Sequence, residues 1–408
     1  MTQPRDGRII TFYSFKGGTG RTMALANTAW ILAANGRRVL AVDWDLESPG
    51  LHKFFRPFLD ESTIGATQGV IDLIAEYSWA ATRNMSRPAE WHREYPEWHR
   101  EYAKIERHVV SIDWPYFPEG GGLDFLSAGR QNRDYSSLVS TFDWDAFYER
   151  LGGGQFFDAL RDDMRANYDY VLIDSRTGLS DIADICTVHF PDCVVACFTL
   201  NDQSIEGAAN VVRRIADRYP HIRILPVPMR VDDAEKEKLD AGRAFARSQF
   251  QGFPAHVPQH EVGEYWGAVE IPYKPFYAYE ETLATFGDAP GSPASLLSAY
   301  ERLTEVLSDG QVRSLPALDD ELRLSYRELF VRRRPILSND VHLSYVPEDR
   351  LWADWTTSLL TRAGMRVHPR PVTGAEDGAE AEGLTEPGAR TIVLLSPAYL
   401  RSPAARRL

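Results

Sequence analysis

The chain has 408 residues, of which 44% are hydrophobic and 25% charged, and its formal net charge is −13. These proportions are typical of a globular protein and exclude a disordered or collagen-like chain. No run of about 18 apolar residues occurs and the N-terminus shows no secretory pattern, so we expect a cytoplasmic protein without a membrane anchor. The acidic balance gives no general attraction for nucleic acid. The three cysteines form no CxxC pair, which argues against a structural zinc site or a disulfide framework.

Short apolar segments alternate with helical patterns through most of the chain. Residues 8–14 predict a strand, a glycine-rich loop follows, and residues 23–36 have apolar side chains at helical spacing. A second strand over 37–45 completes a βαβ unit. Further buried strands are predicted at 123–128, 168–175, 193–200 and 222–228. We therefore expect a doubly wound, mostly parallel α/β domain over residues 1–309.

The segment EWHREY occurs twice, at 90–95 and 97–102, inside an aromatic and charged stretch. We interpret residues 78–118 as an insertion between core elements. His92 and His99 are candidate metal ligands, but no cysteine or acidic cluster completes a metal site. A local duplication on a solvated helical face explains both histidines without a ligand.

The strongest chemical signal lies between the first predicted strand and helix, in Lys16-Gly17-Gly18-Thr19-Gly20-Arg21-Thr22. Glycines let backbone N–H groups turn toward phosphate oxygens, and the helix that follows offers unpaired donors and the positive end of its dipole. We expect this loop, with Met23 after it, to bind the phosphates of a nucleotide. The hydroxyl of Thr22 is placed to be a ligand of Mg²⁺.

This loop resembles the deviant Walker A motif, KGGxGK[ST], of the ParA/MinD family of dimeric P-loop ATPases, and residues 8–50 carry the match most clearly. The resemblance implies ATP as the nucleotide and an ATP-dependent homodimer in which Lys16 reaches the phosphates in the partner subunit. Phe15 stands where the family has Gly, and Arg21 where it has Lys. A guanidinium is longer and bulkier than an ammonium, so the exchange leaves the rate of hydrolysis open.

Two acidic segments extend the resemblance. Residues 43–50 resemble switch I, in which Asp45 matches a carboxylate that positions the attacking water and the Mg²⁺ shell; a turn or helix cap is the alternative. Residues 168–178 resemble the Walker B strand and switch II, in which Asp174 holds Mg²⁺ through water; a buried structural carboxylate is the alternative. The candidate metal ligands are therefore Thr22, Asp45 and Asp174. The candidate catalytic residues, which act by positioning and charge, are Lys16, Asp45 and Asp174.

Arg230 follows the predicted strand at 222–228, where the related ATPases contact the base. The Asn expected at that place is absent. Adenine rather than guanine therefore follows from the family alone, and a base contact by Arg230 competes evenly with a place on the solvated surface.

Residues 338–408 predict a second, smaller α/β unit after a charged linker at 310–337. The unit resembles a flavodoxin-like TIR domain in two segments, DVHLSYVPEDRLWADW and TIVLLSPAYLRS. TIR domains are assembly modules or enzymes that cleave NAD. The catalytic Glu of the enzymes falls at about Leu408, and about half of the domain is missing, so the unit is degenerate or belongs to a fragment. NAD cleavage is not expected in this chain.

The sequence therefore predicts an ATP-binding, ATP-hydrolysing dimeric switch of the ParA/MinD type, coupled to a TIR-like module in bacterial signalling or defence. A nucleotide-binding scaffold with little hydrolysis is one alternative. An NAD-cleaving TIR protein regulated by the ATPase domain is another. The expected partners are a second copy of the chain and a TIR or other protein, with no nucleic acid or membrane evident.

Overall fold

The computed structural model describes residues 5–59, 67–87, 95–178, 185–330, 340–372 and 390–403. The chain divides into two compact units, Met1–Phe330 and Val331–Leu408, which we call the first and the second unit. Within the described ranges, none of the helices combines the length and the apolar character that crossing a lipid bilayer requires.

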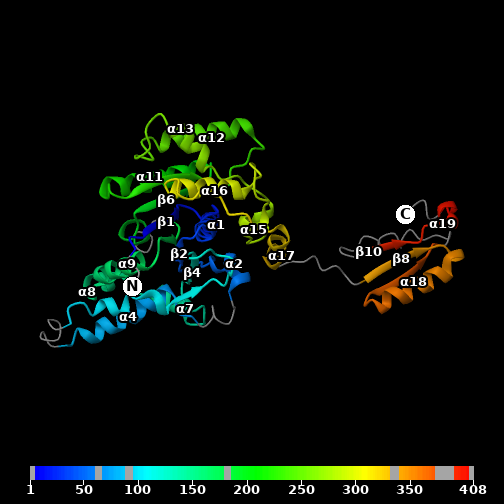
Figure 1. Ribbon diagram of the computed structural model, residues 1–408, viewed down its shortest axis with the longest axis horizontal. Coiled ribbons are helices and arrows are strands. Elements are labelled where there is room, and N and C mark those ends of the chain that lie inside the picture. The colour runs from blue at the N-terminus through cyan, green and yellow to red at the C-terminus, as the bar shows by residue number, and fades with distance from the viewer. Residues whose placement is uncertain are drawn as a thin grey trace. The chain divides into compact units, whose positions relative to one another are not determined.

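A seven-stranded sheet forms the centre of the first unit (Figure 1). Its strands are β1 (Arg8–Ser14), β2 (Arg38–Asp43), β3 (Val109–Ser111), β4 (Gly122–Leu126), β5 (Tyr170–Asp174), β6 (Cys193–Phe198) and β7 (Arg223–Pro228). The spatial order is β3-β4-β2-β5-β1-β6-β7, and every neighbouring pair is parallel except β3 with β4. The predicted α/β class is confirmed for this unit.

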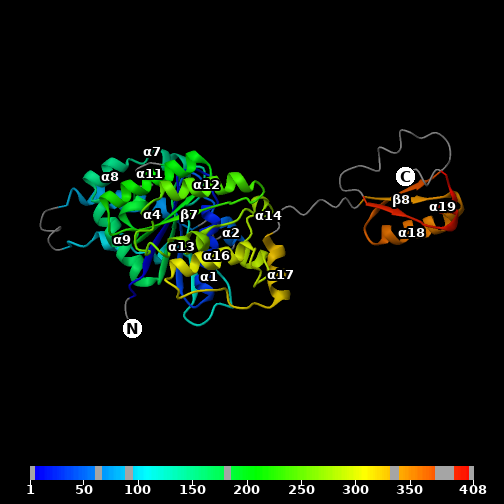
Figure 2. The ribbon, with the colours of Figure 1, turned by 90° about the horizontal axis from the view of Figure 1, so that it is seen from above.

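Helices cover both faces of this sheet (Figure 2). They are α1 (Arg21–Ala34), α2 (His52–Phe55), α4 (Val70–Asn84), α6 (His99–Tyr102), α7 (Tyr135–Thr141), α8 (Trp144–Arg150), α9 (Gly153–Asn167), α11 (Asp202–Arg218), α12 (Lys236–Gln249), α13 (Val262–Val269), α14 (Phe276–Tyr279), α15 (Ala284–Gly287), α16 (Leu296–Leu307) and α17 (Asp320–Phe330). Short 3-10 turns lie at Arg56–Phe58 and Ile105–Arg107, and one π-helical turn at Ile185–His189.

Neighbouring residues of the central strands enter two separate hydrophobic cores. In β5, Tyr170 and Leu172 belong to the core that α1, α13 and α16 complete, whereas Val171 and Ile173 belong to the core of α4, α8 and α9. Side chains of a strand alternate between the two faces of its sheet. Since both faces are covered, the strand is apolar along its whole length, which is why its sequence signal is strong.

The segment predicted as an insertion is partly built into the fold. It contains β3, which pairs antiparallel with β4 at the edge of the sheet. From the second EWHREY copy, Trp98 stacks on Tyr77 of α4 with ring centroids 5.4 Å apart, so this copy is a packed element. His99 begins α6, and His92 lies outside the described residues, so the less favoured alternative that the two histidines bind a metal is untested.

Helix α17 belongs to the first unit, although the sequence predicts the end of that domain at 309 and a linker at 310–337. Phe330 is buried, and its ring lies 5.8 Å from that of Phe286, centroid to centroid. Arg323 donates a hydrogen bond to the backbone carbonyl of Phe286 at 3.0 Å. These contacts extend the first core to Phe330.

The second unit has a three-stranded parallel sheet in the order β10-β8-β9. Its elements are β8 (Asp340–Tyr345), a 3-10 turn (Pro347–Asp349), α18 (Arg350–Arg362), β9 (Arg366–Pro371), β10 (Arg390–Val393) and α19 (Pro397–Arg401). Among its described residues, Leu343, Tyr345 and Ala353 form a small buried apolar cluster, and Val341, Val346 and Tyr399 are also buried. The likeness to a TIR domain stays a prediction, and Leu408 lies outside the described residues.

Candidate functional site

The loop between β1 and α1 borders a cavity of about 510 Å³ at the carboxyl end of the parallel strands. Seven consecutive residues line it, namely Gly17, Gly18, Thr19, Gly20, Arg21, Thr22 and Met23. Gly18 and Gly20 have φ values of +74° and +94°, a region that side chains disfavour. The glycines therefore permit the turn that brings the first residues of α1, where a helix favours anions, to the cavity.

The place of this cavity follows from the strand order. β1 lies between β5 and β6, so the chain passes from β1 to one side of the sheet for β2 and later to the other side for β6. Ligands of open parallel sheets bind outside the carboxyl ends of the strands at such a reversal. The segments after β2, β5 and β7 contribute Asp45, Arg176 and Arg230 to the same wall.

An apolar part of the wall comes from α2, the segment after β7, residues 271–273, α14 and α16. Its side chains include Phe54, Met229, Ile271, Pro272, Tyr273, Tyr277, Leu296 and Tyr300. A cavity with an apolar portion beside a glycine loop suits a ligand with both a flat organic group and an anionic group.

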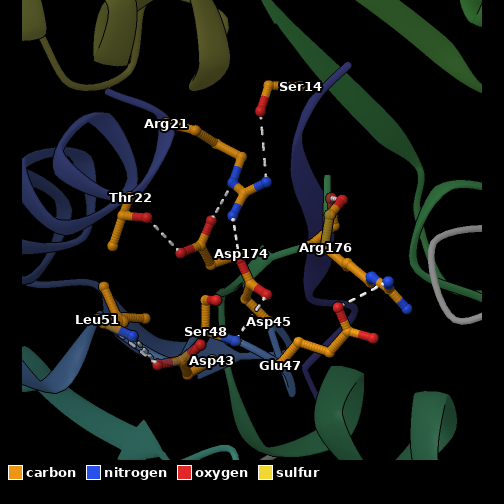
Figure 3. Close-up of polar contacts among 12 residues, drawn as sticks. Ser14, Arg21, Thr22, Asp43, Asp45, Glu47, Ser48, Leu51, Asp174 and Arg176 are labelled. Carbon is orange, nitrogen blue, oxygen red and sulfur yellow. Dashed lines mark hydrogen bonds and ion pairs between the residues drawn. The ribbon is translucent and has the colours of Figure 1, made fainter. Parts of the chain in front are cut away.

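Arg21, at the cavity wall, lies between two carboxylates (Figure 3). Its Nε donates to Oδ1 of Asp174, and its Nη2 donates to Oδ2 of Asp45 at 3.0 Å. Its Nη1 reaches Oγ of Ser14 at 3.4 Å. The Arg21 side chain is 6% exposed and that of Asp174 is 1% exposed, so this is a buried ion pair.

Thr22 is hydrogen-bonded to Asp174, the carboxylate that Arg21 also contacts. Its Oγ1 donates to Oδ2 of Asp174 at 2.7 Å. Burial raises the pKa of Asp174, while the charge of Arg21 and the hydrogen bond from Thr22 act in the opposite direction. The structure therefore brings together the three residues predicted as metal ligands, with Arg21 between the two acids.

Hydroxyl and carboxylate oxygens are the ligands that Mg²⁺ prefers, so Thr22, Asp45 and Asp174 fit such an ion. A positive charge already lies between the two acids, in the guanidinium of Arg21. Among the described residues, no three or more His, Cys, Asp or Glu side chains gather into a metal site. A magnesium ion here would therefore depend on Thr22 and on phosphate oxygens in addition to the carboxylates.

Asp43 is a further buried acid, which lies next to Asp174 and does not line the cavity. It ends β2, directly beside Asp174 in the parallel register. Its Oδ2 accepts hydrogen bonds from the backbone N–H groups of Gly50 and Leu51, both at 3.0 Å. Burial, and next the charge of Asp174, raise its pKa to about 8. The local sequence gives no signal for this contact, because only the parallel register places Asp43 beside Asp174.

Phe15 and Lys16 both contact α11. Lys16 does not line the cavity; its Nζ donates to Oε1 of Gln203. The ring of Phe15 lies against Gly207, where an added Cβ would be 2.1 Å from a ring carbon. The unusual Phe at the start of the loop is thus accommodated by a glycine on a neighbouring helix.

Two further arginines join segments of the cavity wall. Arg230 donates to the carbonyl of Gly18 at 2.7 Å, and its guanidinium lies 5.1 Å from the centroid of the Tyr273 ring. Arg176 forms an ion pair with Glu47 at 2.7 Å, which links the segments after β5 and β2. The sequence marked Arg230 as a candidate, but neither Glu47 nor Gln203 carried a signal of its own.

A glycine loop between the first strand and first helix of a parallel sheet, with carboxylates at the ends of neighbouring strands, defines a P-loop nucleotide-binding domain. Residues 10–307 match the family model CbiA, the CobQ/CobB/MinD/ParA nucleotide binding domain. The chain belongs to this family.

Several solved structures are similar to the chain. The septum site-determining protein MinD of Pyrococcus horikoshii OT3, complexed with Mg-ADP, has 18% identity and a TM-score of 0.49, over 74% of this chain and 96% of that one. The ATP complex of a single-residue variant of Cyanothece McdA has 14% identity and a TM-score of 0.47, over 74% and 97%. Cobyrinic acid a,c-diamide synthase of Mycobacterium smegmatis, with bound ADP and magnesium, has 16% identity and a TM-score of 0.45, over 76% and 100%. No curated protein sequence matches the chain.

Proposed function

We propose that this chain binds ATP together with Mg²⁺ and hydrolyses it to ADP and phosphate. The observation that carries the proposal is the hydrogen bond between Thr22 and Asp174 beside the glycine loop. In P-loop sites, the hydroxyl that follows the loop and a strand-end carboxylate are the protein groups that hold the cation. Membership of a nucleotide-binding family supports the phosphate role of residues 17–23. Adenine as the base rests on the resemblance to ParA and MinD.

The position of each residue in the site gives it a separate role. The loop backbone binds the phosphates, and Thr22, Asp45 and Asp174 hold the cation. When bound, Mg²⁺ neutralises the charge that develops on the transferred phosphoryl group. Asp45 lies at the cavity wall and orients the attacking water. Little covalent chemistry is needed, because catalysis of phosphoryl transfer is mostly positioning and charge stabilisation.

Phosphate release and binding of a fluorescent ATP analogue test this proposal together. The wild type should bind the analogue and release phosphate, and Asp174→Ala should abolish release. Asp217→Ala, on the exposed side of α11, is the matched control and should leave release unchanged. Circular dichroism spectra of both variants establish that they are folded. A wild type that does not bind the analogue overturns the proposal.

A nucleotide-binding scaffold with little hydrolysis is the second candidate. The observation that favours it is the engagement of both Asp45 and Asp174 by Arg21, which occupies the carboxylates that hydrolysis requires. Binding of the analogue without any phosphate release would select this function.

We further propose an ATP-dependent homodimer in which Lys16 serves the site of the partner subunit. The family resemblance suggests it, and the position of Lys16 supports it, since its ammonium contacts Gln203 and does not line its own cavity. Light scattering should give the mass of a dimer only with Mg-ATP, and Lys16→Ala should remove it. Lys238→Ala, at an exposed position of α12, should behave as the wild type. A monomer under all conditions contradicts the dimer.

The second unit is proposed as the TIR-like output of this switch. Support comes from the two resembling segments, which meet in the structure: Oγ of Ser344 and the hydroxyl of Tyr399 are 2.9 Å apart. We expect no loss of NAD on incubation with the chain. Consumption of NAD would instead favour the NAD-cleaving alternative.

A further inference from the structure

The carboxylates assigned to the cation already have hydrogen-bond donors at every oxygen. In Asp174, Oδ1 accepts from Nε of Arg21 and Oδ2 accepts from Thr22. In Asp45, Oδ2 accepts from Nη2 of Arg21 at 3.0 Å, and Oδ1 accepts from the backbone N–H of Ser48 at 3.3 Å. One guanidinium thus supplies the positive charge for both acids.

The planar shape of the Arg21 guanidinium allows it to donate to Asp174 and Asp45 at the same time, and we call this pair of contacts the bridge. Nε and Nη2 are fixed on one plane and point to different acceptors, whereas the ammonium of a lysine is a single point charge on a flexible stem. Arg21 is the first residue of α1, and its side chain reaches back to the ends of β2 and β5. The bridge is buried, so its attraction is screened less than that of a surface pair. Breaking it without a replacement charge would leave two buried acids uncompensated, which is costly.

We propose that Arg21 keeps divalent cations off Asp45 and Asp174 until a nucleotide binds, so that the site accepts its cation only as part of a nucleotide–cation complex. This inference rests on the proposed nucleotide-binding function. A cation alone meets two acids whose oxygens already accept hydrogen bonds, and it must displace the Arg21 guanidinium to bind them. A nucleotide brings phosphates to the glycine loop, and Arg21, on the wall of the same cavity, then has a second anionic partner. The cation takes the acids as the guanidinium leaves them, so no buried charge is left alone.

Thermodynamic linkage follows from this exchange. If the nucleotide raises the affinity for the cation by some factor, the cation must raise the affinity for the nucleotide by the same factor. Removal of Arg21 frees the acids for the cation without nucleotide, and therefore weakens the coupling between the two ligands. Arg21→Lys keeps a positive charge but not the planar fork, and should fall between the wild type and a neutral variant.

The decisive experiment measures the binding of Mn²⁺ alone to the full chain, from the electron paramagnetic resonance signal of free Mn²⁺. Arg21→Met removes the charge and the donors while keeping an unbranched side chain. We expect it to bind Mn²⁺ about tenfold or more tightly than the wild type, which corresponds to about 1.4 kcal/mol. Adding Asp174→Asn to this variant should abolish the gain, which locates the ion at the acids.

Arg176→Met is the matched control, because it removes the same charge from the same cavity wall. Arg176 pairs with Glu47, and neither Asp45 nor Asp174 is its ion-pair partner. Its Mn²⁺ affinity should stay close to that of the wild type. Equal gains in Arg176→Met and Arg21→Met, or a wild type that binds Mn²⁺ alone as tightly as Arg21→Met, would overturn the inference. If Arg21→Met does not fold, the wild type and Arg21→Lys decide the matter by the same comparison.

A second arm measures the fluorescent ATP analogue with Mg²⁺ and with EDTA. The wild type should lose much more affinity in EDTA than Arg21→Met does. A wild type that binds no analogue in either buffer defeats the proposed function, whereas normal analogue binding with no effect of Arg21 on metal affinity or coupling defeats only this inference.

Discussion

Two arginine–carboxylate clusters lie near opposite ends of β1, and burial separates their roles. At the start of the strand, Arg8 and Arg223 donate to Asp309 at 2.7 and 2.5 Å, with the three side chains 35%, 23% and 43% exposed. Beyond its other end, Arg21 lies between Asp45 and Asp174, and none of these three side chains is more than 14% exposed.

The two clusters differ in charge as well as in exposure. In the cluster of Asp309, two arginines hold one acid, and water reaches all three groups. In the cluster of Arg21, one arginine holds two acids away from water. The first cluster joins β1 and β7 to the end of α16, and its groups lose less contact with water than those of the second cluster. The second has fewer positive than negative groups in a buried place, so its stability depends on which cation is present.

The largest expected effect comes from Arg21→Met, which leaves the two acids without a positive partner. We expect the free energy of unfolding of the first unit to fall by about 3–5 kcal/mol, the usual cost of breaking a buried pair. Urea unfolding monitored by circular dichroism measures it, with the transitions of the two units fitted separately. Saturating Mn²⁺ should recover part of the loss. A fall of under about 1 kcal/mol would mean that the cluster behaves like a surface pair.

Thr22→Val should have the next largest effect. The variant keeps the branched shape but removes the hydroxyl that donates to Asp174. A hydrogen bond to a buried charged group contributes about 1.5–3 kcal/mol, and the same urea experiment should show a loss in this range. Thr22→Ser retains the hydroxyl and is the control; an equal loss in both variants would assign the effect to packing.

Asp309→Asn should lower the free energy of unfolding by less, about 0.5–1 kcal/mol, because Asp309 and its two partners are all partly exposed. Asp309 has a φ of 52°, which Asn tolerates well, so the backbone contributes little to the difference. Salt at about 1 M should shrink this cost but leave the cost of Arg21→Met nearly unchanged, because screening acts on exposed charges. Equal salt sensitivity in the two variants would contradict the contrast between the clusters.

The smallest effect is the pH dependence of the Asp309 cluster. Burial alone would raise the pKa of Asp309, but the hydrogen bonds from Arg223 and Arg8 outweigh it and lower the pKa below its ordinary value. The stability that this acid contributes is therefore present above the pKa of the unfolded chain and is lost as the pH falls through the folded value. The difference in unfolding free energy between the wild type and Asp309→Asn should be constant from about pH 7 to about 5 and shrink below about 4. A difference that grows on acidification would contradict the assignment.

Elements with a complete local signal were predicted well from the sequence. β1, the glycine loop and α1 carry an apolar run, glycines and helical spacing in one short stretch, and β5 is apolar throughout because both of its faces are buried. The sequence does not reveal β3, because this strand has three residues and pairs antiparallel at the sheet edge. The fold of α17 onto the first core depends on Phe286, far from it in the chain, which a charged local sequence does not reveal.

For the site too, contacts between residues far apart in the chain could not be predicted from local sequence. The loop residues and the acids at 45 and 174 were recognisable from their order, but the bond that joins Arg21 to both acids depends on the adjacency of β2, β5 and β1 in the sheet. Local pattern suggested that Arg21 faces phosphate. The position of Asp43 beside Asp174 is hidden for a similar reason, since only the register of β2 against β5 shows that the two residues are neighbours.

The contact between Phe15 and Gly207 joins the start of the glycine loop to α11. An added Cβ at Gly207 would lie 2.1 Å from a carbon of the Phe15 ring, so the ring fills the space beside the backbone of α11. A side chain larger than that of glycine at position 207 would therefore displace either the helix or the ring, and with the ring the start of the glycine loop.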